Sequence, residues 1–286
     1  MNNVIKVSVP KSQIIRRKTI TVLKWTFFGV VLFFLYSPIL YIIIQSVNLS
    51  STGASFTGFT LKWYKKMFEQ RDLMEAIYTT VSMAVLATLI SVVFGTLSAI
   101  GINGLNKAKR KNMILINNVP ILNADIVTGI FLMLMLQIIQ AVLPGINIFG
   151  YYSMLFAHVF FCTPYIILSV LPKLNEVDNN LFDAATDLGC KPFDALWKVI
   201  IPSIKPGIIS GALIAFTMSI DDFVISYMTG SSGVQNFSIW LYSIKNPFRN
   251  NAMQMAFAYN TIISVGTLLI LIIYNILKSR KKGLKK

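Results

Sequence analysis

Long stretches without a charged side chain constrain this sequence more than any other feature. Residues 25–61 and 76–106 contain no Asp, Glu, Lys or Arg, and residues 112–172 contain one, Asp125. A helix needs about 20 predominantly apolar residues to cross the hydrocarbon of a bilayer, so each stretch can hold at least one span. Only 13% of the chain is charged, whereas a soluble domain carries about 25%. Core helices of a large soluble protein are therefore a poor alternative to membrane spans.

The apolar pattern predicts an all-α, polytopic fold with about six transmembrane helices. Their expected ranges are 25–47, 77–103, 114–142, 150–172, 205–229 and 252–277. The turn signal Leu143-Pro144-Gly145 separates the third span from the fourth. The first apolar run is too long for the core of a cleavable signal peptide and shows no small-residue cleavage pattern.

Most of the 26 Lys and Arg residues gather on one side of these spans, in the two tails and in the loops that follow the second and fourth spans. Because Lys and Arg remain cytoplasmic, both termini are expected on the cytoplasmic side of the cell membrane. Residues 1–24 and 278–286 are then basic cytoplasmic tails around a permease domain at 25–277. The net charge of +15 therefore reflects the topology of the chain, and it also favours contact with anionic lipid headgroups. Nucleic acid is not an expected partner, because no aromatic and basic binding surface accompanies the charge.

The cytoplasmic loop 174–204 has the features of a helix hairpin. An Asp or Asn among residues 178–180 could cap a first helix, and Gly189 could end it in a left-handed conformation. A second short helix is expected to begin at Pro192 and to stop before Pro202. Both helices are amphipathic, so a lipid surface or a partner protein must cover their apolar sides.

The hairpin resembles the EAA loop of ABC importer permeases, whose pattern is Glu-Ala-Ala, three residues, Gly, nine residues, Ile, one residue, Leu-Pro. The matching residues are Asp183, Ala184, Ala185, Gly189, Val199, Ile201 and Pro202. Asp, Val and Ile here replace Glu, Ile and Leu of the pattern. The resemblance implies the type I ABC importer permease fold.

In that family the loop docks into a groove of a separate ATPase. By this resemblance Asp183 is a polar anchor, Ala184 and Ala185 permit close approach, and Gly189 makes the tight turn before Pro202. The sequence contains no G-x-x-x-x-G-K-[ST] motif for phosphate binding. The chain is therefore expected to be a transport subunit without enzymatic activity or a cofactor of its own, with ATP and Mg²⁺ bound by the ATPase.

Resemblance extends over nearly the whole chain and is closest to the second permease of spermidine/putrescine importers. The matching stretches are 58–64, 125–127, 155–164 and 219–226. The family often has Pro before the aspartate of the third span, where this chain has Ala124. The resemblance implies two ATPase copies, a similar second permease, and an extracytoplasmic binding protein that meets the polar segment 231–251.

Carboxylates within the spans give independent support for a cationic cargo. Asp125, Asp221 and Asp222 have no Lys or Arg near them in the same spans, since Lys205 lies at the far end of the fifth span. An ionised Asp in mid-membrane costs roughly 2.5–3.5 kcal/mol. Such residues usually line a pathway, although bonding to a neighbouring helix or to the partner permease is the alternative. Trp63 and Tyr227 could bind ammonium groups through cation–π contacts, or could anchor the chain at the membrane interface.

Two other functions remain open from the sequence. A secondary transporter would work without an ATPase and usually shows an internal repeat of its spans, which this chain lacks. Another small solute could replace polyamines as cargo, and nothing in the sequence separates putrescine from spermidine. His158, alone in an apolar span, is expected to hydrogen-bond between helices. Cys162 and Cys190 fall in a span and a cytoplasmic loop, so no disulfide is expected.

Overall fold

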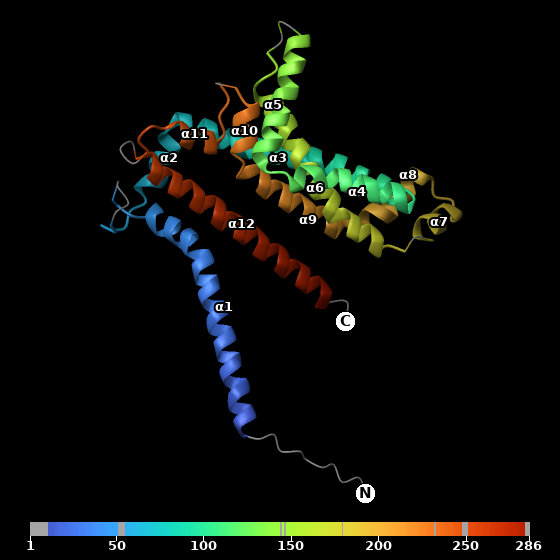
Figure 1. The fold of residues 1–286 in the computed structure, drawn as a ribbon, viewed down its shortest axis with the longest axis horizontal. Coiled ribbons are helices and arrows are strands. Elements are labelled where there is room, and N and C mark those ends of the chain that lie inside the picture. The colour runs from blue at the N-terminus through green and yellow to red at the C-terminus, as the bar shows by residue number, and fades with distance from the viewer. Residues whose placement is uncertain are drawn as a thin grey trace. The chain divides into compact units, whose positions relative to one another are not determined.

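A computed structural model describes residues 11–50, 55–143, 145, 147–178, 180–231, 233–247 and 251–283 (Figure 1). This described part is helical and contains a single isolated β-bridge, between Asn48 and Phe59. Six of its helices are long and apolar enough to cross a membrane. They cover Lys18–Ser46, Arg71–Asn103, Asp125–Val142, Tyr151–Glu176, Pro192–Ile220 and Ala252–Ile270. The predicted all-α, six-span fold is confirmed.

The chain divides into two compact units, and the smaller one combines residues from both ends of the chain, 1–69 and 246–286. Its helices are α1 (Lys11–Ser46), α2 (Lys62–Glu69) and α12 (Ala252–Gly283). Helix α12 packs against both α1 and α2, and the rings of Tyr41 and Phe257 meet edge to face at 6.2 Å. Because α1 begins at Lys11, part of the segment expected as a basic tail is helical.

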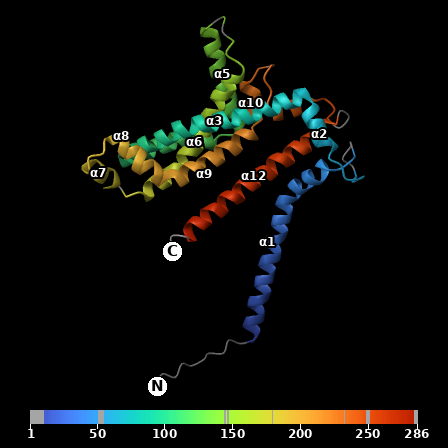
Figure 2. The ribbon, with the colours of Figure 1, turned by 180° about the vertical axis from the view of Figure 1, so that it is seen from behind.

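The larger unit, residues 70–245, contains the hairpin and all but one of the expected path residues. Its helices are α3 (Arg71–Asn103), α4 (Lys107–Leu122), α5 (Asp125–Val142), α6 (Tyr151–Glu176), α7 (Asn180–Asp187), α8 (Pro192–Ala195), α9 (Ile201–Ile220), α10 (Val224–Thr229) and α11 (Phe237–Ser243). Helices α3, α6 and α9 lie side by side and form its centre (Figures 1 and 2). Their shared core includes Ala99, Phe161, Ile166, Val170, Ile204 and Ala215.

Glycines allow α6 to approach its two neighbours closely. A Cβ atom added to Gly95 of α3 would lie 2.7 Å from the Cβ of Ile166, and one added to Gly211 of α9 would lie 3.1 Å from the Cα of Ile166. A Cβ at Gly207 would lie 2.8 Å from the carbonyl oxygen of Ser169. In hydrocarbon, helices associate largely by close packing of this kind, so these glycines set the spacing of the central three helices.

Two expected spans are interrupted in the structure. The range 114–142 was expected as one helix, but α4 ends at Leu122, Asn123 and Ala124 are extended, and α5 begins at Asp125. The range 205–229 is likewise divided, because α9 ends at Ile220 and α10 begins at Val224. Hydropathy averaged over the length of a span conceals these breaks, although polar residues mark both: Asn123 and Asp125 at the first, and Asp221 and Asp222 at the second.

We expect Gly95→Val to lower the stability of the protein in detergent by about 1–3 kcal/mol, because the new side chain must displace Ile166. Gly101→Val is the matched control in the same helix, since a Cβ at Gly101 meets nothing within 4 Å. Thermal unfolding of the purified variants measures the difference. Equal losses in both variants would contradict close packing at Gly95.

Candidate functional site

The helix hairpin expected at residues 174–204 begins with a side-chain cap. The carboxylate of Asp178 accepts a hydrogen bond from the backbone N–H of Asn180 at 3.0 Å, and α7 starts at Asn180. Satisfying a free N–H at a helix start is the usual role of an Asp there. The expected cap is therefore confirmed at Asp178, while Asn179 lies outside the described residues.

Gly189 ends α7 in the left-handed conformation, with φ +88°. The N–H of Cys190 donates to the carbonyl oxygen of Ala185 at 3.1 Å, and the N–H of Gly189 donates to that of Thr186 at 2.9 Å. These two bonds define a Schellman motif, which favours glycine at the left-handed position. The sequence prediction for Gly189 is confirmed.

The second helix of the hairpin begins at Pro192 as expected, but it does not stop before Pro202. It passes through a π-helical turn, Leu196–Ile200, directly into α9. Pro202 lies in the first turn of α9. A proline without its N–H normally interrupts a helix, but the wider turn before it, where the N–H of Ile201 bonds to Leu196, accommodates the ring. The hairpin and the span are thus one continuous helical rod.

The hairpin exposes apolar side chains. Leu188 is 86% exposed, Phe193 70% and Trp197 52%, and the rings of Phe193 and Trp197 lie 6.0 Å apart. Asp183 and Ala184 are also exposed, whereas Ala185 is buried. Side chains of this size exposed together indicate a surface that another protein or lipid covers. Of the two adjacent alanines, Ala184 can contact a partner and Ala185 packs within the hairpin.

Asp222 stabilises the break between α9 and α10. Its carboxylate accepts hydrogen bonds from the backbone N–H groups of Ile225 at 3.3 Å and Ser226 at 2.7 Å, and from the Ser226 hydroxyl at 2.7 Å. Asn236 donates to the Asp222 carbonyl oxygen at 2.8 Å. The Asp222 side chain is only 8% exposed. Its carboxylate therefore serves as a helix cap, the alternative that the sequence left open.

His158 connects three helices behind this cap. Its Nδ1 lies 2.6 Å from the Ser219 hydroxyl of α9, and its Nε2 lies 2.9 Å from the Ser226 hydroxyl of α10. The Asp222 carboxylate is 3.6 Å from Nε2, and the imidazole is 1% exposed. The expectation that His158 hydrogen-bonds between helices is confirmed.

Asp125 and Asp221 differ from Asp222 because both are exposed. Helices α5 and α10 pack together where a Cβ on Gly129 would lie 3.3 Å from Met228. Asp125 precedes Gly129 by one helical turn, about 6 Å, and Asp221 lies just before α10. The two breaks therefore bring two exposed carboxylates to neighbouring helices. Within the described residues, neither carboxylate forms a salt bridge.

An aromatic cluster adjoins a cleft of about 460 Å³ beside α10. Tyr227 lies 5.5 Å from Phe223 and 5.8 Å from Tyr242, measured between ring centroids. Tyr227 and Tyr242 line the cleft together with the polar residues Ser226, Ser231, Gln235 and Ser243. Among the described residues, none that lines the cleft is charged. The sequence singled out Tyr227, whereas the role of Tyr242 depends on α11 folding back onto α10.

Trp63 is not an exposed ring. It is 3% exposed, its indole N–H donates to the Asn48 carbonyl oxygen at 2.6 Å, and the Lys62 and Lys66 ammonium groups lie 5.8 and 5.6 Å from its ring centroid. It belongs to the smaller unit, whereas the other expected path residues belong to the larger one. The structure thus gives Trp63 a packing role between the first two spans. Its ring already makes cation–π contacts with Lys62 and Lys66 of this chain.

Solved structures share this six-span fold. The chain superposes on a chain of a bacterial ABC transporter involved in the import of the acidic polysaccharide alginate, with a TM-score of 0.71 and 14% sequence identity over 94% of this chain and 98% of that one. A chain of an amino acid ABC transporter gives a TM-score of 0.52 and 17% identity over 78% of this chain and 100% of that one. These similarities show the fold.

Residues 112–283 match the family described as the binding-protein-dependent transport system inner membrane component, and the chain belongs to that family. It is 30% identical over 222 residues to the spermidine/putrescine transport system permease protein PotC of Haemophilus influenzae, covering 78% of this chain and 84% of that protein. It is 29% identical to the putrescine permease PotI of Escherichia coli over 73% and 75% of the two chains. The chain is therefore a multi-pass membrane subunit of a transport system and not an enzyme.

We expect Asp222→Ala to lower stability in detergent by about 1–3 kcal/mol, because buried backbone N–H groups lose their acceptor. Asp221→Ala is the neighbouring control and should change stability by no more than about 0.5 kcal/mol, since its side chain is exposed. Thermal unfolding of both variants compares them. A larger loss at Asp221 than at Asp222 would contradict the assigned roles.

Proposed function

We propose that this chain is one of two membrane-spanning permeases of an ATP-driven importer for polyamines, spermidine or putrescine. The observation that carries the cargo assignment is the pair of exposed, unpaired carboxylates, Asp125 and Asp221, at two breaks on neighbouring helices. Carboxylates facing a polar route through a membrane attract cations. The spermidine/putrescine permeases among the relatives agree with this charge.

The aromatic cleft supplies the second kind of group that a polyamine requires. A polyamine alternates ammonium groups with methylene chains, and ring faces attract ammonium groups by roughly 0.5–2 kcal/mol each. Tyr227 and Tyr242 line the cleft that begins at Ser226, four residues after the Asp222 cap. In this proposal the tyrosines contact the cargo first, and Asp221 and Asp125 then bind its ammonium groups. Asp222 stabilises the break between α9 and α10.

The hairpin couples this path to a separate ATPase, of which we infer two copies that bind ATP and Mg²⁺. Asp183, Ala184 and the exposed apolar side chains of the hairpin form the docking surface. Helix α9 continues from the hairpin for 20 residues, about 30 Å, and ends beside Asp221. A displacement of the hairpin can therefore reach Asp221 along one continuous helix.

The remaining partners follow from the same proposal. A similar but distinct permease completes the path, and an extracytoplasmic binding protein delivers cargo to the face formed by residues 231–251. Both termini are then cytoplasmic, with the basic segments 1–24 and 278–286 against the inner leaflet. A solved relative of the fold is in complex with an alginate pentasaccharide-bound periplasmic protein, at 15% identity and a TM-score of 0.68.

Uptake of radiolabelled spermidine and putrescine by cells with the complete transporter tests the importer and its cargo together. We expect Gly189→Arg to abolish uptake, because the left-handed conformation costs a side chain about 1–2 kcal/mol and the new residue projects from the docking surface. A Cβ at Gly189 meets nothing within 4 Å, so no clash within this chain can explain the loss.

Gly189→Asn is the matched control, because Asn tolerates the left-handed conformation, and it should retain most of the uptake. Normal uptake by Gly189→Arg would exclude coupling through the hairpin. Absence of polyamine uptake by the unmodified transporter, with the ATPase still bound, would keep the importer and reject the cargo.

The carboxylates are tested by Asp125→Asn and Asp221→Asn, each of which should reduce polyamine uptake about tenfold or more by removing one charge contact. Asp72→Asn changes an exposed carboxylate at the start of α3 and should leave uptake unchanged. Membrane levels of each variant are measured by immunoblot. Unchanged uptake in both path variants would overturn the path assignment.

A further inference from the structure

A buried asparagine, Asn236, joins the two helices that form the walls of the aromatic cleft. One wall is α10, which carries Tyr227, and the other is α11, which carries Tyr242. The ring centroids of these tyrosines lie 5.8 Å apart. Asn236 is 2% exposed and directly precedes α11. Its bonds to α10 therefore affect how closely the two walls approach.

Both ends of the Asn236 amide are hydrogen-bonded. Its Oδ1 accepts from the N–H of Ile239 at 2.9 Å and caps α11. Its Nδ2 donates to the Asp222 carbonyl oxygen at 2.8 Å and to the Ser226 hydroxyl at 2.9 Å. Because a backbone N–H only donates and a carbonyl only accepts, these partners fix which end of the amide is oxygen. One side chain thus caps α11 and holds it against the start of α10.

The Ser226 hydroxyl requires a donor at position 236. It donates its hydrogen to the Asp222 carboxylate at 2.7 Å. It can therefore only accept from its other two partners, the Asn236 amide and Nε2 of His158, which lies 2.9 Å away. A hydroxyl has one hydrogen and two acceptor sites, so these three bonds use its full capacity. A side chain at position 236 that cannot donate to Ser226 breaks the link between the walls.

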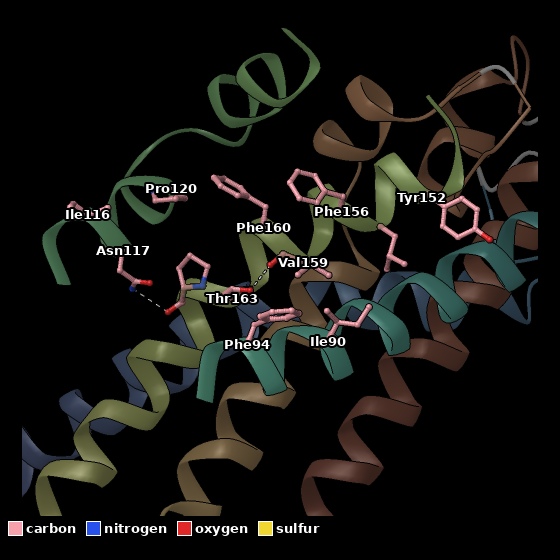
Figure 3. A pocket seen from close by; sticks show the side chains of 12 residues that line it. Ile90, Phe94, Ile116, Asn117, Pro120, Tyr152, Phe156, Val159, Phe160 and Thr163 are labelled. Atoms are coloured by element: carbon pink, nitrogen blue, oxygen red, sulfur yellow. Dashed lines mark hydrogen bonds between the residues drawn. The ribbon is translucent and has the colours of Figure 1, made fainter. Parts of the chain in front are cut away.

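The pocket between α3, α4 and α6 offers no comparable recognition, although at about 690 Å³ it is larger than the cleft. Figure 3 shows that aromatic and aliphatic side chains dominate its lining. Two of its polar side chains bond within the chain: the Thr163 hydroxyl donates to the Val159 carbonyl oxygen at 2.6 Å, and the Asn117 amide donates to that of Pro164 at 3.4 Å. A polyamine would lose its hydration there with little in return. Of these two cavities, the cleft is therefore the one suited to ammonium groups.

The position of Tyr242 is sensitive to the orientation of α11 at Asn236. Tyr242 follows Asn236 by six residues, about 9 Å along the helix. A tilt of about 10° at Asn236 would move that position by about 1.6 Å. A gap of about 0.5–1 Å already forfeits a quarter to a half of a dispersion contact, so a tilt of this size would cost much of the contact between the tyrosine and a bound cation.

We propose that Asn236 is a positioning residue of the cargo path, which holds Tyr242 at the distance from Tyr227 at which both rings contact one bound polyamine. Asn236 itself is buried and acts through Tyr242. Its role in recognition rests on the proposed polyamine cargo, whereas its effect on the distance between the two tyrosines does not.

The test is equilibrium binding of radiolabelled spermidine to the assembled transporter in detergent, without the binding protein. Asn236→Ser should weaken binding about tenfold, the loss expected for one cation–π contact. Ser still caps α11, but its shorter side chain cannot reach both Asp222 and Ser226. Asn106→Ser is the matched control, because Asn106 caps α4 by accepting from the N–H of Lys109. The control should bind spermidine normally, and normal binding by Asn236→Ser would overturn the proposal.

A double-mutant cycle separates positioning from a general structural role. Tyr242→Leu removes the ring and should weaken spermidine binding about tenfold. Because Asn236 acts through that ring, adding Asn236→Ser to Tyr242→Leu should weaken binding by less than about twofold more. A further tenfold loss in the double variant would show that the two residues act independently and would overturn the proposal.

Cross-linking tests the distance between the walls without any cargo. Tyr227→Cys and Tyr242→Cys are combined in a chain with Cys190→Ser, since the remaining Cys162 is buried. A short bifunctional thiol reagent should join positions 227 and 242, and Asn236→Ser should lower the yield severalfold, as measured by peptide mass spectrometry. An unchanged yield would overturn the positioning role. A lowered yield in a transporter that does not bind spermidine would support the positioning role and reject the cargo.

Discussion

Backbone groups within a membrane have no water to bond, and the interruption between α9 and α10 is possible because Asp222 satisfies them. Its carboxylate takes the N–H groups that begin α10, while His158 joins Ser219 on one side of the break to Ser226 on the other. The exposed position of Asp221 depends on this arrangement. A buried, hydrogen-bonded carboxylate thus fixes the exposed position of its neighbour.

The second helix of the hairpin continues into α9, so the hairpin is joined through one helix to the break after Ile220. A hairpin that ended at Pro202 would be separate from the span, whereas here the backbone continues through a π-helical turn into α9. The glycine contacts of α6 with α3 and α9 leave little free volume at the centre of the bundle. Movement of α9 is therefore expected to be transmitted to its end rather than absorbed on the way.

Sequence patterns predicted the spans, the hairpin and its glycine, because each depends on neighbouring residues. They did not locate the breaks, since the polar residues that mark them, among them Asn123 and Asp221, were averaged into long apolar stretches. They placed the end of the second hairpin helix too early, because the rule that proline stops a helix ignores the turn before it. They offered Trp63 as a cation-binding ring or as an anchor at the membrane interface, and did not indicate that its indole is buried and donates to Asn48.

The sequence by itself determined the membrane location, the all-α class and the hairpin, because hydropathy, charge and turn preference add up along a continuous segment. Only the tertiary structure decided which of two adjacent aspartates is exposed. That choice depends on Ser226 and Asn236, which approach Asp222 only after the chain folds back. Their bonds bury one carboxylate and leave the other free, and no local property of the sequence distinguishes the two residues.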